Sequence, residues 1–204
     1  MNRILHGLYW RMLLLYLDDI IVIAMDFDTN LHRLGDVVQR LYKIGLKLKP
    51  SKCELLQPQV CYLGHIVSQG GVSMVPDKVK AVTEWLNPRR VKELQGFLGT
   101  VGYYRQYIQE FATIAHPLHW LTAKGESCRW TEGEQIAFNK LKDSISTTPL
   151  LGYPDPWRQY ILDTDASGCG VGAVLSQIQE CCERVIAYYS KTLTLLERDY
   201  CVTR

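Results

Sequence analysis

Residues 12–24 read Met12-Leu-Leu-Leu-Tyr16-Leu-Asp18-Asp19-Ile-Ile-Val22-Ile-Ala24, two short apolar runs that meet at two adjacent acids. Their length and β-branching predict two buried strands with a tight turn. The turn would hold two carboxylates that repel each other, and the flanking strands would limit their hydration. A divalent cation relieves both effects, and paired cations could stabilise a phosphoryl-transfer transition state. Aspartate is also a common turn residue, and the dipeptide alone favours that simpler explanation. The apolar strands on both sides shift the balance towards a metal site.

After the hairpin, the spacing of apolar residues predicts one helix and then short strands. The helix begins near Thr29 and ends at Gly45, with an apolar face made of Leu31, Leu34, Val38 and Leu41. Strands are predicted over residues 46–49, 60–63, 65–68 and 72–75, with a turn at Gly70-Gly71 before the last one.

The middle of the chain is predicted to be helical. A helix from Pro76 ends at Asn87-Pro88, a longer one covers residues 91–109, and a third begins near Phe111. The capping-box pattern Thr131-x-x-Glu134 begins a fourth. Between His116 and His119, Pro117 is expected to spoil a helical metal-binding pair. The predicted core positions are Val79, Val82, Trp85, Leu86, Leu94, Phe97, Leu98, Val101, Tyr104, Ile108, Ala137, Phe138, Leu141 and Ile145.

The last quarter of the chain is predicted to be a separate sheet. Residues 153–156, with two prolines, read as a linker or domain boundary, and strands follow over residues 159–163, 170–176 and 184–189. A helix begins near Thr194 and continues to Arg204. The apolar face of this sheet, with Ile161, Val171, Ala173 and Val174 among its candidates, would have little helical cover. We therefore expect this part to be the least stable.

Composition and charge narrow the class of protein. The chain has 204 residues and is 47% apolar and 22% charged, which is typical of a globular protein. Residues 33–109 carry a net charge of +7, whereas residues 110–204 carry −3. A basic middle suits binding to a phosphate backbone, although a solvated basic surface would look the same. Seven cysteines without a Cys-x-x-Cys pair predict neither a zinc knuckle nor a disulfide scaffold. No signal peptide or membrane-spanning run is recognisable, so we expect an intracellular protein.

The Tyr16-Leu-Asp-Asp19 hairpin between apolar strands resembles the catalytic hairpin of reverse transcriptases, in the form found in gypsy-like long-terminal-repeat retrotransposons. The resemblance continues in order along the chain. Gly45–Cys53 resembles the segment after the palm helix, Tyr62-Leu-Gly-His-Ile-Val67 the primer-grip hairpin, and Phe97–Ile108 the thumb helix. Arg129-Trp-Thr131 and Pro149-x-Leu151 fit the connection. Asp165-Ala-Ser-x-x-Gly170-Val-Gly-Ala-Val-Leu-Ser176 resembles the first strands of ribonuclease H.

The resemblance implies roles for particular residues. Asp18, Asp19 and Asp165 would be catalytic carboxylates that bind Mg²⁺. The implied contacts to nucleic acid are Tyr16, Lys49, Lys52, Gly64, Gly99, Tyr103 and Arg105. Several of these residues could equally serve solubility or folding. The lysines suit solvent as well as phosphate, and Gly64 could mark a bulge. Gly99 costs about 1 kcal/mol against alanine in a helix, which either a nucleic-acid backbone or tight helix packing could justify.

The implied fold is α+β. It comprises a partial reverse-transcriptase palm and start of the thumb (1–90), a helical connection (91–150) and a truncated ribonuclease H-like α/β domain (151–204). The parent protein would take an RNA or DNA template-primer, an RNA–DNA hybrid and deoxynucleoside triphosphates. A third palm aspartate and the ribonuclease H glutamate, which would follow Tyr200–Arg204, are expected outside these residues. The alternative is a decayed or co-opted copy that only binds nucleic acid.

Overall fold

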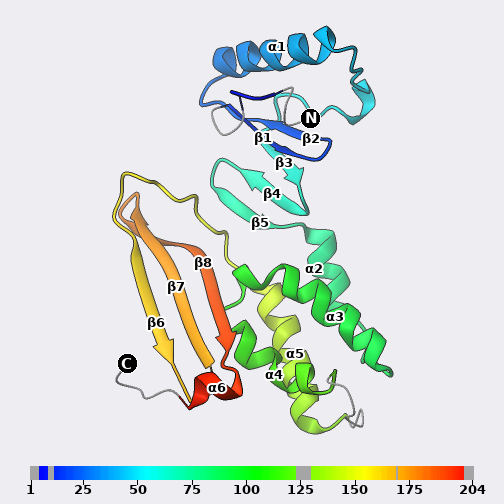
Figure 1. Ribbon diagram of the computed structural model, residues 1–204, viewed down its shortest axis with the longest axis vertical. Coiled ribbons are helices and arrows are strands. Elements are labelled where there is room, and N and C mark those ends of the chain that lie inside the picture. The colour runs from blue at the N-terminus through cyan, green and yellow to red at the C-terminus, as the bar shows by residue number, and fades with distance from the viewer. Residues whose placement is uncertain (1–4, 9–11, 123–129, 169, 200–204) are drawn as a thin grey trace. The chain divides into compact units, whose positions relative to one another are not determined.

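The computed structural model describes residues 5–8, 12–122, 130–168 and 170–199, and it contains both helices and strands (Figure 1). Contacts within the chain divide it into two compact units. The first comprises Met1–Leu63 and Val67–Gln69, and the second comprises Gly64–Ile66 and Gly70–Arg204. Residues 90 and 150 both lie inside the second unit, so the three-part division stays a prediction. No helix among the described residues is long and apolar enough to cross a membrane.

The first unit is built on the predicted hairpin. β1 (Leu13–Tyr16) and β2 (Asp19–Val22) pair antiparallel, with Leu13 opposite Val22 and Tyr16 opposite Asp19. α1 (Phe27–Lys43) begins at Asp26, whose carboxylate accepts a hydrogen bond from the backbone N–H of Thr29, and the chain turns away at Gly45. The core of this unit is small and comprises Leu5, Leu8, Leu13, Leu15, Val37 and Leu41.

Three expectations for the first unit are corrected. The strands are half-buried rather than buried, because alternate residues such as Leu13 and Leu15 face the core while Tyr16 does not. On α1 the predicted face is confirmed at Leu41, but the other buried residue is Val37, and Leu31 and Val38 are exposed. No strand forms over residues 46–49. They are exposed and lead into the short 3₁₀ helix η1 (Pro50–Lys52).

The chain passes from the first unit to the second within three short strands. They are β3 (Gln59–Tyr62), β4 (His65–Ser68) and β5 (Gly71–Met74), which follow one another in the order β3-β4-β5 of one sheet. Leu63 and Gly64 form a two-residue turn in which both have positive φ, 50° and 75°. That backbone twist matches the twist of an antiparallel hairpin. All three strands lie within about two residues of their predicted positions.

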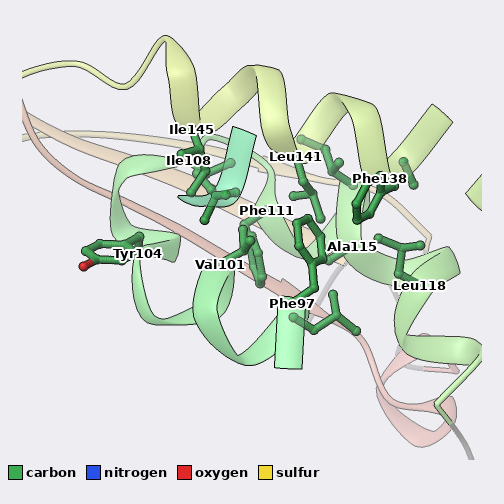
Figure 2. Packing of buried hydrophobic residues seen from close by; sticks show 14 of the residues in the cluster. Phe97, Val101, Tyr104, Ile108, Phe111, Ala115, Leu118, Phe138, Leu141 and Ile145 are labelled. Atoms are coloured by element: carbon green, nitrogen blue, oxygen red, sulfur yellow. The ribbon is translucent and has the colours of Figure 1, made fainter. Parts of the chain in front are cut away.

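The second unit contains the main core (Figure 2), which lies among the helices. The helices are α2 (Pro76–Thr83), α3 (Val91–Tyr103), η2 (Arg105–Tyr107), α4 (Phe111–Trp120) and α5 (Glu132–Ser146). Thr131 and Glu134 form the predicted capping box at the start of α5. The predicted core is confirmed by the buried residues Val82, Leu94, Phe97, Leu98, Val101, Tyr104, Ile108, Ala137, Phe138, Leu141 and Ile145.

The helices depart from expectation at three places. Leu86 is 83% exposed because α2 ends at Thr83, before the helical turn that would have buried it. The predicted helix over residues 91–109 is interrupted at Tyr104, where α3 ends and η2 begins. α4 continues through Pro117, since burial of Ala115 and Leu118 on both sides offsets the backbone bond that proline cannot make.

The last three strands form an antiparallel sheet in the order β6-β7-β8. They are β6 (Ile161–Ala166), β7 (Gly170–Gln179) and β8 (Cys182–Thr192), followed by the short helix α6 (Leu195–Arg198). One face of β8 packs against the helices. Val185 and Tyr188 touch the main core, and the Ser190 hydroxyl accepts a hydrogen bond from the N–H of Ala112 at 2.8 Å. This sheet is therefore partly covered, contrary to expectation. Tyr200–Arg204 lie outside the described residues.

The predicted linker is tied to the sheet. We call residues 153–158 the linker segment. The side chain of Gln177, fully buried in β7, accepts a hydrogen bond from the N–H of Asp155 and donates to the carbonyls of Asp155 and Arg158. Gln179 donates to the carbonyl of Tyr153 at 2.7 Å. Gln177 and Gln179 thus make four hydrogen bonds with a segment that composition alone predicts to be a linker or domain boundary.

β5 also pairs with the backbone of Leu151, just after the predicted helical connection. Val72 and Leu151 exchange two backbone hydrogen bonds, of 2.8 and 3.0 Å, and Gly152 donates to the carbonyl of Val185 at 2.8 Å. Gly71 has a φ of 143°, and a Cβ built there would lie 2.2 Å from the Leu151 carbonyl oxygen. Only glycine fits at this position, because the neighbouring backbone approaches so closely.

Candidate active-site and nucleic-acid-binding residues

The hairpin in the first unit carries the paired acids at its tip. Leu17 and Asp18 form the two-residue turn, and Leu17 has a positive φ of 51°. Asp19 is the first residue of β2 and lies opposite Tyr16. Both carboxylates are therefore adjacent in the chain, one in the turn and one on the strand.

The tip is exposed to solvent rather than enclosed. Asp18 and Asp19 are exposed, as are Tyr16 and Leu17, at 54% and 75%. The expected loss of hydration by the flanking strands is thus wrong for this unit. Two exposed carboxylates still match what Mg²⁺ takes from a protein, namely one or two carboxylates completed by water and substrate phosphates. Among the residues that the structure describes, no group of three or more His, Cys, Asp or Glu side chains could hold a metal ion.

Two lysines of the first unit flank a fixed turn. Lys49 precedes η1 and Lys52 ends it, and both side chains are exposed. The Lys49 carbonyl accepts hydrogen bonds from the N–H of Lys52, at 2.9 Å, and from the thiol of Cys53, at 3.3 Å. The turn holds the backbone while both ammonium groups remain in solvent, where they can meet phosphate.

In the second unit, His65 is surrounded by tyrosine rings. It stacks on Tyr103 and on Tyr107, with centroid separations of 5.4 and 5.7 Å, and meets the edge of Tyr104 at 5.5 Å. The Tyr107 hydroxyl and His65 Nδ1 share a hydrogen bond of 2.9 Å, and Tyr104 donates one to the Gly64 carbonyl at 3.0 Å. Burial lowers the pKa of His65 below its ordinary 6.5, so the ring is neutral at pH 7. Burial raises the pKa of Tyr107 to about 12.

The two glycines of the predicted nucleic-acid surface have different environments. A Cβ on Gly64 would approach the Tyr104 hydroxyl to 3.2 Å, at a φ of 75°, so the fold itself explains this glycine. A Cβ on Gly99, in α3, would meet nothing within 4 Å. Tight helix packing therefore does not account for Gly99. Its neighbour Gly96 is nearly as open, with one atom of Trp85 at 3.9 Å.

The polar positions near these glycines are partly exposed. Tyr103 is 55% exposed, whereas Tyr104 is buried, as core packing predicted. Arg105 begins η2 and is exposed. Arg105 and Tyr103 therefore lie on either side of a buried tyrosine that is bonded to Gly64.

The third predicted carboxylate lies on the C-terminal sheet. Asp165 is exposed on β6, on the same face as Asp163, and lies opposite Gly172 of β7. The glycine leaves the strand surface beside Asp165 uncovered. Two carboxylates thus line one strand, although only Asp165 precedes the Ala-Ser of the motif.

Sequence reasoning missed His65 and Tyr107 as a pair. The sequence pattern places His65 in a strand and Tyr107 among several aromatics of a helix, with nothing to connect them. The available signal was the spacing of Tyr104 and Tyr107, which lie three residues apart and share one side of a helical turn.

Comparison with known families supports two assignments along the chain. Residues 1–67 match the family described as reverse transcriptase (RNA-dependent DNA polymerase). Residues 130–204 match the RNase H-like domain found in reverse transcriptase. Enzymes of both families generally use a divalent metal ion.

Similar full-length proteins are polyproteins of transposable elements. The Pol polyprotein of transposon 297 from Drosophila melanogaster is 39% identical over 98% of this chain, and that of transposon opus, also from D. melanogaster, is 38% identical over 91%. The transposon Tf2-3 polyprotein of Schizosaccharomyces pombe is 32% identical over 92%. The chain spans 19%, 20% and 14% of their lengths, which is a fifth or less of each.

Solved structures share the fold. A foamy viral protease-reverse transcriptase (dRH) in complex with double-stranded DNA superposes with a TM-score of 0.84 at 24% identity, covering 97% of this chain and 35% of its own. A foamy viral protease-reverse transcriptase in complex with an RNA/DNA hybrid gives a TM-score of 0.81 at 24% identity, over 97% and 27%. The two family matches and the polyprotein relatives, with the ordered motifs, show that the chain belongs to the reverse transcriptase and ribonuclease H region of long-terminal-repeat retrotransposon Pol polyproteins.

Proposed function

We propose that the chain is part of an enzyme that synthesises DNA on an RNA template and degrades the RNA of the resulting hybrid. The observation that carries this proposal is the exposed Asp18-Asp19 pair at the tip of the β1–β2 hairpin, inside the segment that matches reverse transcriptases. Asp18 and Asp19 would hold Mg²⁺ for polymerisation, and Asp165 would hold Mg²⁺ for hybrid cleavage. Bound Mg²⁺ would neutralise phosphate charge and polarise the reacting phosphoryl group.

The remaining candidate residues would position the substrates, namely a template-primer, an RNA–DNA hybrid and deoxynucleoside triphosphates. Lys49 and Lys52 would contact phosphates, including those of the incoming nucleotide. Tyr16 would contact the primer end beside Asp19. Arg105 would contact a phosphate, Tyr103 would stack on a sugar or base, and Gly64 and Gly99 would allow a nucleic-acid backbone to approach. We also propose that the enzyme acts inside the cell.

For the isolated 204-residue chain, nucleic-acid binding without synthesis is the expected activity. The resemblance to reverse transcriptases implies a third metal-binding aspartate beside Asp18 and Asp19, and the described residues bring no third carboxylate to the hairpin tip. Primer extension on an RNA template, with purified chain and Mg²⁺, should give no product. Template-dependent incorporation that disappears in Asp18→Asn would contradict this expectation.

Hybrid binding can be measured directly by fluorescence anisotropy. We expect affinity for a labelled RNA/DNA hybrid to fall steeply with salt, because cations on the protein displace counterions from phosphates. Charge reversal at Lys49, Lys52 or Arg105 should weaken binding and reduce the slope of log affinity against log salt by about 1 each. Lys140→Glu, at an exposed position of α5 in the part of the chain with net negative charge, is the matched control and should change little. Affinity indifferent to salt and to these substitutions would overturn the proposal.

A further inference from the structure

Two buried tyrosines attach one short turn of the second unit to the Gly64–Ile66 segment. Tyr104 and Tyr107 are 3% and 2% exposed, and their hydroxyls bond to the Gly64 carbonyl and to His65 Nδ1. Backbone hydrogen bonds from Tyr107 N–H to the Tyr104 carbonyl and from Ile108 N–H to the Arg105 carbonyl close the turn. The turn over residues 104–107 is therefore held at both of its ends.

The exposed members of this turn are Arg105 and Gln106, which lie between the two attachment points. A flexible arginine loses rotational freedom when it binds a phosphate, and a fixed backbone reduces what remains to be ordered. The contacts of the Tyr107 side chain thus also fix the position of the Arg105 backbone, from which the Arg105 side chain extends. Among the partners of Tyr107, His65 contributes one hydrogen bond and one ring stack, beside a tilted ring contact with Tyr104.

We propose that His65 is a positioning residue, which through Tyr107 fixes the 104–107 turn so that Arg105 meets a phosphate of bound nucleic acid. The proposal rests on the proposed function of Arg105 as a phosphate contact. In this proposal His65 acts through Tyr107 rather than by touching nucleic acid, because its ring lies between Tyr103 and Tyr107 and against the edge of Tyr104. The imidazole is neutral and the phenol keeps its proton at pH 7, so their hydrogen bond persists there.

The test uses the salt dependence of binding, because loss of one phosphate contact changes the salt slope by about 1. The probe is a labelled B-form DNA duplex bound to the full 204-residue chain at several salt concentrations. Arg105→Gln should reduce the slope by about 1. His65→Ala should reduce it by about the same amount, and the double variant should lose no more than Arg105→Gln alone. A role limited to stability would lower the active fraction without changing the slope.

Two further variants separate positioning from general destabilisation. His65→Asn keeps a polar atom at the place of Nδ1 and should keep the wild-type slope. Tyr107→Phe removes one oxygen atom from the core and should reduce the slope, which gives a reading even where His65→Ala does not fold. The expected results together support the proposal.

The contrary outcomes point to different failures. An unchanged slope in Arg105→Gln would show that Arg105 contacts no phosphate, and both the inference and that part of the proposed function would fall. A reduced slope in Arg105→Gln with wild-type slopes in His65→Ala and Tyr107→Phe would overturn the positioning role alone. Additive losses in the double variant would also overturn it, because His65 would then act independently of Arg105.

Discussion

Replacing Gly71 by alanine tests the backbone pairing between β5 and Leu151. At a φ of 143° an alanine is strained, which costs about 1–3 kcal/mol. Its Cβ would lie 2.2 Å from the Leu151 carbonyl oxygen, so one of the two backbones must move. That movement breaks the two hydrogen bonds between Val72 and Leu151, each worth about 1 kcal/mol net. We therefore expect Gly71→Ala to lower the free energy of unfolding of the second unit by about 3–5 kcal/mol.

Gly70→Ala is the matched control. Gly70 lacks a positive φ, and a Cβ there would make an ordinary 3.4 Å contact with the Leu150 side chain. Denaturant unfolding followed by tryptophan fluorescence measures the difference, and amide hydrogen exchange locates it. Protection should fall at Val72 and Leu151 and remain unchanged in α1 of the first unit. Equal unfolding midpoints for Gly71→Ala and Gly70→Ala would contradict this prediction.

Three further predictions address other parts of the chain. Gly99→Ala and Gly96→Ala should each stabilise α3 by about 1 kcal/mol, but only Gly99→Ala should weaken hybrid binding; equal affinities in the two variants would exclude a backbone contact at Gly99. Gln177→Leu should leave polar groups of the linker segment unpaired, at a cost of about 1–3 kcal/mol, and expose that segment to trypsin; unchanged resistance would contradict its anchoring role. The hydrogen bond from Lys191, with those from Thr194, lowers the pKa of Glu197 to about 2, so the stabilisation present above pH 4.5 should be lost as the pH falls towards 2. Carbon-13 NMR should place the titration midpoint of the Glu197 carboxyl at about 2, and Lys191→Met should raise that midpoint. A midpoint near 4.5 in the wild type would contradict the interaction between Lys191 and Glu197.

The sequence was most informative where one local signal decides the structure. Thr131 and Glu134 predicted a helix start because a capping box satisfies backbone groups within four residues. The helix-spaced residues from Leu94 to Val101 predicted the core of α3, since a buried helix face needs that spacing. Within the candidate site, the tight turn at Asp18 and Asp19 was predicted from the two apolar runs that it joins.

The features that sequence reasoning missed depend on partners far away in the chain. The interruption of α3 at Tyr104 accompanies hydrogen bonds to residues about 40 positions earlier, and no local pattern reports those. Composition predicted only a linker or domain boundary at residues 153–156, because Gln177, the partner of this segment, lies about 20 residues later. The exposure of Asp18 and Asp19 likewise could not be read from flanking apolar residues, because alternate strand positions face opposite sides.

Cross-linking to nucleic acid identifies directly which residues of the chain touch the substrate. An RNA/DNA hybrid with photoreactive nucleotides near the primer end would be bound to the 204-residue chain, irradiated and mapped by mass spectrometry. We predict salt-sensitive cross-links in peptides that contain Lys49, Lys52, Tyr103 and Arg105, and loss of the last two in His65→Ala. Cross-links confined to residues 110–204, which carry a net negative charge, would contradict the assignment of Lys49, Lys52, Tyr103 and Arg105 to nucleic-acid binding. Cross-links unaffected by salt would contradict it as well.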